Sequence, residues 1–454
     1  MTFVENPMPL SSDPRGLLLA PRRPGLSRRG LLALGGAAAL GSVATARTAW
    51  AGGAHFDWTL AGPDAGGFSA AGLANVRATI QKHIEAADTP GAVSAIVRNG
   101  KLVWYEALGF RDPVAGEPMR KDDIFRMMSS TKHVTAIAVL MMIEDGKLSL
   151  DDKVSRFIPT FKDMKVAVLP PGVTDISQAQ LVPAEREITI EHLLTHTSGI
   201  TSVGDKLSPS PAAALNRIQR APDETLETWT RKLGTAVLDF QPGTRFSYSP
   251  TDALDVALRI VEITSGQPAD VFLRERLFEP LDMRDTGFNL SAAQTSRLVK
   301  IFGRINGQWS AQDHVFGPGP YRYFSGGGGL FGTVHDFINL EFMLLNRGQF
   351  NGRRILRPES VALMTRDHAG ALFRQWIPPL TAGHGFGLTV RIVEDPAKAN
   401  GRGVGAFGWG GAYGTDSWVD PQRQMVAAFF QQVKPLTFAV ENDFEKAVHA
   451  AIVS

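Results

Sequence analysis

Strand-like segments stand at both ends of this chain, and this arrangement restricts the folds open to it. Near the start, apolar β-prone runs at 92–97 and 102–108 flank Asn99 and Gly100. An Asn-Gly pair between two such runs is a strong signal for a β-hairpin. Alternation typical of strands returns late in the chain, at 385–393, 417–420 and 425–431. Because these pieces lie far apart, we expect one antiparallel sheet with a helical region inserted into it.

Helical periodicity fills the middle of the chain and returns at its C-terminal end. We expect helices at 134–143, 190–196, 252–264, 269–277 and 443–453, each bounded by Gly, Ser, Asn or Pro signals. Asn442 is the predicted N-cap of the last helix. The predicted fold class is α+β: an antiparallel β-sheet flanked by helices, with an inserted all-helical lobe at about 150–320.

The N-terminal 51 residues have the composition of an export signal. Arg28 and Arg29 precede an apolar, small-residue stretch at 31–46, and Ala49-Trp50-Ala51 offers an A-x-A cleavage site. Paired arginines in this setting are typical of a twin-arginine signal peptide. The apolar run is glycine-rich and shorter than the roughly 20 residues that a membrane span needs. We therefore predict a signal peptide at 1–51, a folded domain at 52–454, a periplasmic or secreted location, and no stable membrane insertion after cleavage.

Charge and cysteine content exclude several kinds of partner. Residues 1–51 carry six of the 47 basic and two of the 45 acidic residues, so the remainder carries a net charge of −2. It has no Lys/Arg-rich run, which argues against nucleic acid or an anionic membrane as a partner. The chain contains no cysteine, so an exported form must depend on its core rather than on disulfides. The sequence does not predict the oligomeric state.

A serine is followed three residues later by a lysine only once in this chain, at Ser129 and Lys132. The pair stands at the head of the strongly apolar run 134–143. Side chains three apart on a helix lie on one face and can touch. A serine hydroxyl becomes a nucleophile when a neighbouring base takes its proton, and an amine of lowered pKa can be that base. The pair therefore indicates a serine hydrolase that uses lysine, although a helix-capping serine beside a surface lysine is the alternative.

Three other patterns resemble binding motifs but lack the parts that binding requires. His192 and His196 have the spacing of zinc ligands, yet Leu193 stands where zinc proteases have a glutamate, so packing or capping is the favoured role. Gly403–Gly408 matches a dinucleotide-binding pattern, but the residues after it start a helix poorly. Gly326–Gly329 lacks the Gly-Lys-Ser/Thr of a phosphate loop and better suits a tight strand entry. We predict no metal and no organic cofactor.

Two further segments favour the hydrolase interpretation. Tyr248 follows a polar turn just before the helix expected at 252–264, where its hydroxyl can face a cleft. A tyrosine packed in a loop is an equally good alternative. Trp409-Gly410-Gly411-Ala412 precedes the last two predicted strands. Glycines there let the backbone approach a ligand and leave an N–H free for an oxyanion, and a plain β-bulge is the alternative.

These segments, in this order, resemble the serine β-lactamase-like hydrolases, particularly the class C-like branch of esterases and penicillin-binding-protein relatives. Phe125 to Lys132 resembles the family's first box and Pro242 to Ser249 its second. Connecting segments also resemble the family, at 144–152, 190–199, 277–283 and 327–330. The resemblance extends from about Ala92 to Gln431, which is nearly all of the chain after residue 51.

The chain departs from the β-lactamases of this family at two positions. Pro250 replaces the asparagine of the second box, and proline has no amide donor to offer a substrate. Trp409-Gly410-Gly411 replaces the Lys-Thr-Gly of the third box, which removes a cation and adds an aromatic wall. The Trp-Gly-Gly form is similar to that of the carboxylesterase members. The resemblance therefore implies an apolar ester rather than a β-lactam.

The resemblance also implies the roles of the site residues. Ser129 is the expected nucleophile, activated by Lys132 and Tyr248, with the backbone N–H groups of Ser129 and Ala412 as the oxyanion hole. Trp409, Gly410 and Gly411 are expected to line the acyl or alcohol pocket. The predicted substrate is a small-molecule ester. The alternatives are a β-lactamase, a D-amino peptidase, an amidase or an acyltransferase of the same fold, and, from another class, a non-catalytic binding protein on this scaffold.

Overall fold

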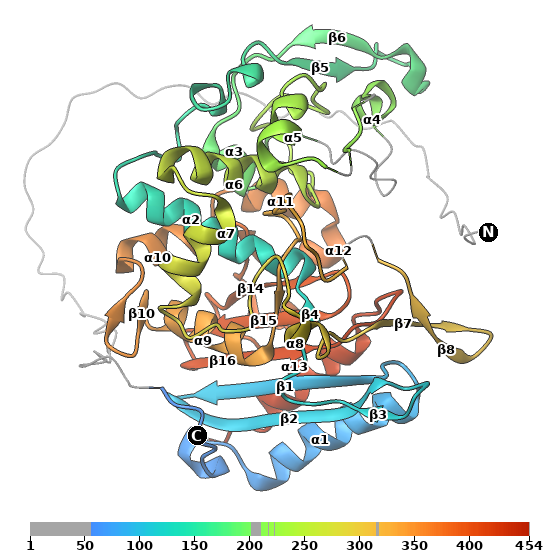
Figure 1. Ribbon diagram of the computed structural model, residues 1–454, viewed down its shortest axis with the longest axis vertical. Coiled ribbons are helices and arrows are strands. Elements are labelled where there is room, and N and C mark those ends of the chain that lie inside the picture. Colours follow the sequence, from blue (N-terminus) through green and yellow to red (C-terminus); the bar gives the residue numbers. More distant parts are fainter. Residues whose placement is uncertain (1–55, 201–209, 217, 222, 315–316, 454) are drawn as a thin grey trace, which may run out of the picture. The chain divides into compact units, whose positions relative to one another are not determined.

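The computed structural model describes residues 56–453 except 201–209, 217, 222 and 315–316 (Figure 1). The predicted signal peptide and its cleavage site lie outside the described residues. Within the described part of the chain, no helix has both the length and the apolar character that crossing a bilayer requires.

An eight-stranded antiparallel sheet forms the centre of the described structure. Its strand order is β12-β13-β14-β15-β16-β1-β2-β3, so the two ends of the chain meet where β1 pairs with β16. The bounds are β1 (Gly91–Arg98), β2 (Lys101–Asp112), β3 (Glu117–Pro118), β12 (His384–Phe386), β13 (Arg391–Val393), β14 (Phe407–Gly411), β15 (Thr415–Asp420) and β16 (Met425–Phe430). Asn99 and Gly100 have φ values of 53° and 72° and form the predicted hairpin turn between β1 and β2.

Helices cover both faces of this sheet. α1 (Ala70–Glu85) and α13 (Ala439–Ala450) pack on one face, where Trp418 and Phe429 of the sheet meet Phe444 of α13. Figure 1 shows α1 alongside β1 and β2. On the other face, α9 (Val334–Leu345) contacts β1, β15 and β16, and α2 (Thr131–Glu144) belongs to the same hydrophobic core. The predicted fold class, a helix-flanked antiparallel sheet, is confirmed.

The middle of the chain, where an all-helical lobe is predicted at about 150–320, contains β-hairpins as well as helices. Its helices are α3 (Ile190–Leu194), α4 (Pro211–Leu215), α5 (Leu226–Leu233), α6 (Asp252–Ser265), α7 (Ala269–Leu273), the π-helical turn η6 (Arg274–Phe278) and α8 (Ala292–Thr295). Two hairpins accompany them, β5 (Lys165–Val168) with β6 (Gln180–Pro183), and β7 (Ile301–Ile305) with β8 (Gln308–Gln312). Asn306 and Gly307 turn the second hairpin with φ values of 50° and 79°, which is the same signal as at Asn99 and Gly100.

Short elements complete the described structure. They are η1 (Pro63–Gly66), β4 (Phe125–Arg126), η2 (Met128–Ser130), η3 (Val154–Arg156), η4 (Pro159–Phe161), η5 (Ile176–Gln178), β9 (Phe331–Gly332), β10 (Gln349–Phe350), β11 (Arg353–Arg354), α10 (Pro358–Met364), α11 (Gly370–Trp376), α12 (Pro378–Thr381) and η7 (Pro396–Lys398). β4 pairs with β9, so the segment before α2 is tied to the segment that follows the glycine tract at 326–329.

Two predicted elements have different bounds in the structure. The segment 385–393 is two short paired strands, because the chain turns at Thr389, where φ is +66°. The last helix begins at Ala439 after Phe438, so Asn442 is not its N-cap. Val440 is buried against the sheet, which favours one more helical turn, and the Asn442 side chain instead accepts a hydrogen bond from Asn400 at 3.0 Å.

Candidate active site

Ser129 lies on the 3-10 turn η2, between β4 and the N-terminus of α2. The residue before it, Met128, has a φ of +47°, a strained conformation for a residue with a side chain. α2 is apolar around most of its circumference and its residues from Thr131 to Met142 are buried, so packing on all sides fixes the helix. The turn therefore presents a partly exposed serine from a rigid support.

Lys132 lies one helical turn beyond Ser129 and is fully buried. Its Nζ lies 3.2 Å from Ser129 Oγ and donates to the carbonyl oxygens of Pro250 at 2.5 Å and Gly327 at 2.6 Å. These three partners come from three segments far apart in the sequence. The predicted contact between the hydroxyl and the amine is present.

Tyr248 reaches the same serine from the loop that precedes α6. Its hydroxyl donates to Ser129 Oγ at 2.6 Å, and Lys132 Nζ lies 5.0 Å from the centre of its ring. Trp409 Nε1 donates to the Tyr248 hydroxyl at 3.3 Å. Of the two alternatives for Tyr248, a cleft or a packed loop, the structure shows a half-buried ring whose hydroxyl contacts the serine. The structure thus brings Ser129, Lys132, Tyr248 and Trp409 together.

The imidazole ring of His196 packs against the ring of Tyr248. Its ring centre lies 4.7 Å from that of Tyr248, and its Nδ1 accepts a hydrogen bond from Ser249 N at 3.2 Å. Burial, with a smaller effect of the Lys132 charge, holds the pKa of His196 well below its usual 6.5. A neutral imidazole that accepts at Nδ1 carries its proton on Nε2. His196 therefore has a packing role, and among the described residues no group of three potential metal ligands occurs.

The Trp409-Gly410-Gly411 segment belongs to strand β14 rather than to a loop before the strands. Gly410 pairs with Asp416 and Gly411 with Thr415 in regular antiparallel register, so this part of β14 contains no β-bulge. A Cβ on Gly411 would lie 2.4 Å from Met127 O and 3.2 Å from Met128 Cβ. Glycine at 411 therefore lets β14 lie directly against the turn that carries the serine.

Ala412 follows β14 in an exposed turn. Its backbone N–H has no hydrogen-bond partner among the described residues, whereas the neighbouring Gly414 N–H donates to Gly411 O. Since Gly411 lies against η2, this N–H is at the edge of the serine site. It can donate to a ligand oxygen without breaking an existing bond.

The glycine tract at 326–329 contributes to the site, which sequence reasoning missed. A Cβ on Gly326 or Gly327 would lie 2.6 Å from Leu254 O or 2.5 Å from Thr251 Cα. The glycines thus allow the loop to pack on the start of α6 and to place the Gly327 carbonyl at Lys132. The fully buried Asp255 anchors this loop by accepting hydrogen bonds from Tyr323, from Ser325 Oγ at 2.8 Å and from Gly327 N at 3.1 Å. In the sequence, the available signal was the uninterrupted run of glycines at 326–329, which indicates a place where two backbones come close.

An aromatic cluster adjoins the serine, and its largest part was also missed. Phe246, Phe373 and Phe386 are buried, and the partly buried Tyr248, Trp376 and Trp409 pack against them. Trp376, the last residue of α11, stacks on Tyr248 with ring centres 5.8 Å apart and planes at 29°. No catalytic box includes Trp376, so only the structure assigns it to this site.

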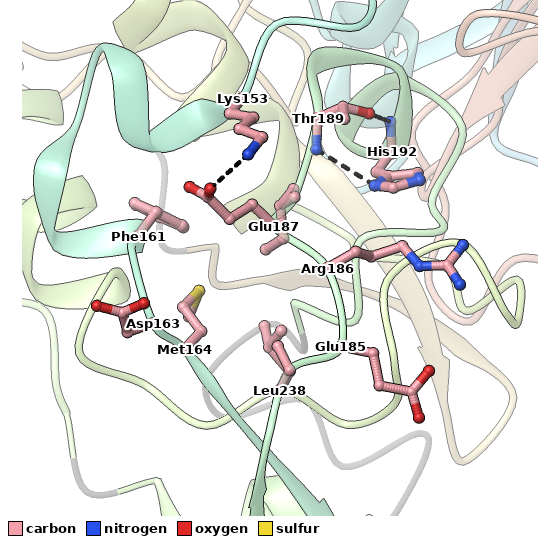
Figure 2. Close-up of a pocket in the computed structure, with 12 residues that line it drawn as sticks. Lys153, Phe161, Asp163, Met164, Glu185, Arg186, Glu187, Thr189, His192 and Leu238 are labelled. Atoms are coloured by element: carbon pink, nitrogen blue, oxygen red, sulfur yellow. Dashed lines mark hydrogen bonds and ion pairs between the residues drawn. The ribbon is translucent and has the colours of Figure 1, made fainter.

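A cavity of about 450 Å³ lies apart from the serine, in the middle lobe (Figure 2). Lys153 forms an ion pair with Glu187 at 2.8 Å on its wall, while His192 Nδ1 accepts from Thr189 N at 3.2 Å. His192 N in turn donates to Thr189 Oγ1, which completes a capping box at the start of α3. The predicted capping role of His192 is confirmed. None of Ser129, Lys132 and Tyr248 lines this cavity.

Comparison with known proteins agrees with the fold. Residues 76–451 match the sequence profile of a family described as Beta-lactamase. The chain is 36% identical over 371 residues to Protein Rv1367c of Mycobacterium tuberculosis, covering 79% of this chain and 90% of that protein. It is 34% identical over 361 residues to Esterase EstB of Burkholderia gladioli, covering 73% and 82%. A solved structure, "EstCE1, a hydrolase with promiscuous acyltransferase activity", is 27% identical with a TM-score of 0.67, covering 84% and 99%.

Proposed function

The chain belongs to the beta-lactamase family of serine hydrolases, which has esterase and acyltransferase members, and from that premise we propose that it cleaves carboxylic esters through an acyl-enzyme on Ser129. One observation carries the proposal. The Lys132 amine and the Tyr248 hydroxyl both lie within hydrogen-bond distance of Ser129 Oγ, at 3.2 and 2.6 Å. This is the arrangement that a serine nucleophile needs in order to lose its proton.

The two carbonyl partners of Lys132 fix the position of its amine beside Ser129. A neutral amine has two N–H donors and one lone pair. Pro250 O and Gly327 O can take both donors, which leaves the lone pair directed at Ser129 Oγ. Tyr248 completes a path on which the proton can later pass to the leaving alcohol.

The oxyanion of the tetrahedral intermediate would lie between the backbone N–H groups of Ser129 and Ala412. Support comes from the free N–H of Ala412 and from Gly411, which holds β14 against η2. Donors placed where charge develops stabilise the transition state, and loss of one such donor typically costs about 3–4 kcal/mol.

Two residues favour an ester over a β-lactam. Pro250 has no amide to hold the side chain of a β-lactam, and its carbonyl oxygen is already bonded to Lys132. Trp409 presents an indole beside the serine, where the β-lactamases of this family have a cation. Trp409, with Gly410 and Gly411, would line the apolar side of the ester.

Acyl transfer is a second candidate function, because the chain shares its fold with EstCE1, which is described as a hydrolase with promiscuous acyltransferase activity. The site is partly exposed at Ser129 and Tyr248, so an alcohol can compete with water for the acyl-enzyme. Product analysis with an added alcohol separates transfer from hydrolysis. Nitrocefin, amide and D-amino peptide substrates test the remaining enzyme alternatives.

The central test is hydrolysis of p-nitrophenyl acetate and butyrate, with intact-mass detection of the acyl-enzyme. We expect Ser129→Ala to abolish turnover and the mass increase, since Ser129 Oγ is the hydroxyl that contacts both Lys132 and Tyr248. An exposed serine, Ser177→Ala, is the matched control and should not change turnover. Wild-type rates in Ser129→Ala would sink the proposal. If the folded wild type neither turns over nor reacts with a fluorophosphonate, the chain is a binding protein instead.

Export is part of the proposal. The paired arginines and small-residue cleavage site at 1–51 would direct the folded protein across the membrane into the periplasm or the medium. Fractionation of cells that express the full chain tests this. Replacement of Arg28 and Arg29 by lysine should retain the protein in the cytoplasm, and export that survives this change would argue against a twin-arginine signal.

A further inference from the structure

We propose that Trp376, with the neighbouring Ile377 and Leu380, forms a subsite that binds an apolar group of the ester. This inference rests on the proposed ester hydrolysis and extends it to the substrate class: an ester with an extended hydrocarbon group. The three residues lie on α11, α12 and the residue between them, outside the boxes that carry the family resemblance.

Trp376 packs directly on buried aromatic side chains of the core. Phe246, Phe373 and Phe386 are each at most 1% exposed and form the floor. Trp376 lies on that floor, with its ring centre 5.2 Å from Phe246 and 5.8 Å from the half-buried Tyr248. Since the Tyr248 hydroxyl contacts Ser129 Oγ at 2.6 Å, the tryptophan stands one ring away from the reacting serine.

Beyond Trp376 the apolar surface is open to solvent. Ile377 is 37% and Leu380 60% exposed. Large exposed apolar side chains near a reactive group are candidates for a binding surface, because contact with an apolar ligand removes them from water. Both follow closely in the chain after Trp376, which stacks on Tyr248, whose hydroxyl contacts the serine. A hydrocarbon group attached to the ester is therefore the occupant that the position of the patch favours.

Local contacts hold α11 and α12 in place, and an ion pair balances the charge of Arg374 on α11. The Arg374 guanidinium on α11 forms an ion pair with Glu394 at 2.7 Å and donates to His384 O at 3.2 Å. Thr381 Oγ1 donates to Ile377 O at 3.0 Å, and Pro378 and Pro379 restrict the backbone between them. A prearranged wall loses little entropy when a substrate binds.

The test compares kcat/KM for p-nitrophenyl acetate and octanoate, and in a second series for ethyl and octyl acetate. Each methylene moved from water to an apolar site is worth about a fourfold gain in affinity. We expect the octanoate-to-acetate ratio, or the octyl-to-ethyl ratio, to exceed about 30 in the wild type, since partial burial of six methylenes suffices for that. The series that responds shows whether the group belongs to the acyl or the alcohol side.

The variants separate the subsite from general damage. Trp376→Ala should lower the responding ratio more than about tenfold and Leu380→Ser about threefold, while Trp376→Phe keeps the stacking on Tyr248 and most of the ratio. Phe438→Ser is the matched control, because Phe438 is also 60% exposed but caps α13. Unchanged ratios in both Trp376→Ala and Leu380→Ser, with active wild type, would overturn the subsite alone. An inactive wild type would instead defeat the proposed ester hydrolysis.

Discussion

The serine site and the contact between α13 and the sheet both bury charged side chains, but they satisfy them differently. At the serine site, the fully buried Lys132 has three partners within 3.2 Å. Beneath α13, one Oε of Glu441 and the indole Nε1 of Trp418 are buried without a hydrogen-bond partner in the described structure. A buried group with all its partners is held in one position, whereas a buried carboxyl with an unpaired oxygen favours its neutral form.

The cluster beneath α13 contains one paired and one poorly paired carboxylate on the same helix. Glu445 forms a buried ion pair with Arg402, which also contacts Asp416 at 3.1 Å. Glu441, one turn earlier, has only a long hydrogen bond of 3.4 Å from Gln431. Burial, with a smaller effect of the Asp416 charge, raises the pKa of Glu441 to about 8. The comparison predicts that the serine site governs chemistry and the α13 cluster governs stability and its pH dependence.

The largest effect should come from Lys132→Met, which keeps an unbranched side chain as far as Cε and removes the amine. Without a base for Ser129, we expect kcat/KM for p-nitrophenyl acetate to fall about a thousandfold or more. Two buried carbonyl oxygens also lose their donor, so the melting temperature should fall. Lys147→Met, at an exposed lysine just after α2, is the control. Retention of more than a tenth of the wild-type kcat/KM would show that Lys132 is not the base for Ser129.

Sequence reasoning anticipated the parts of this site that depend on local pattern. The hairpin at Asn99 and Gly100 and the apolar helix behind Ser129 each follow from a few neighbouring residues. The first and second boxes supplied Ser129, Lys132 and Tyr248, and the structure brings these three together. Their catalytic roles stay predictions.

The rest of the site depends on contacts between distant segments. The carbonyl partners of Lys132 lie 118 and 195 residues away in the chain, and a backbone oxygen has no sequence signature. Asp255 acts only through the glycine loop that it anchors. Trp376 resembles any tryptophan of a short amphipathic helix until its stacking on Tyr248 is seen. The hairpin in the middle lobe is different, because its Asn-Gly turn at 306–307 is a local signal that could have found it.

An intermediate effect should come from Glu445→Gln. This change leaves Asp416 as the remaining charged partner of the buried Arg402 guanidinium, and breaking a buried ion pair costs about 3 kcal/mol of unfolding free energy. Denaturant unfolding at pH 7 measures the difference. Glu279→Gln is the comparison variant, because its pair with Arg274 is exposed, at 65% and 53% of the two side chains, and should contribute less than about 1 kcal/mol. Equal losses in the two variants would show that the Arg402 cluster is as solvated as the surface pair.

The smallest effect on activity, with a stability change of opposite sign, should come from Glu441→Gln. The carboxyl has a pKa of about 8 in the folded protein, against 4.5 as its ordinary value. The folded state therefore holds this proton more tightly than the unfolded state, so the stabilisation is complete below pH 4.5 and is lost as the pH rises towards 8. Glutamine does not titrate, so the variant should match the wild type near pH 4.5 and exceed it by about 4 kcal/mol at pH 8.5.

Unfolding free energies of both proteins from pH 4.5 to 8.5 measure this effect. The wild-type curve should fall away from that of Glu441→Gln with a slope of at most about 1.4 kcal/mol per pH unit for one proton. Glu441 lies on a helix that does not contact Ser129, so kcat/KM of the variant should equal that of the wild type at pH 7. Parallel stability curves would mean that Gln431 and water satisfy the carboxylate, and the contrast with the fully partnered Lys132 would then disappear. A change in kcat/KM with parallel curves would instead couple the two clusters through Gln431, whose side chain packs on Gly414 in the turn after β14.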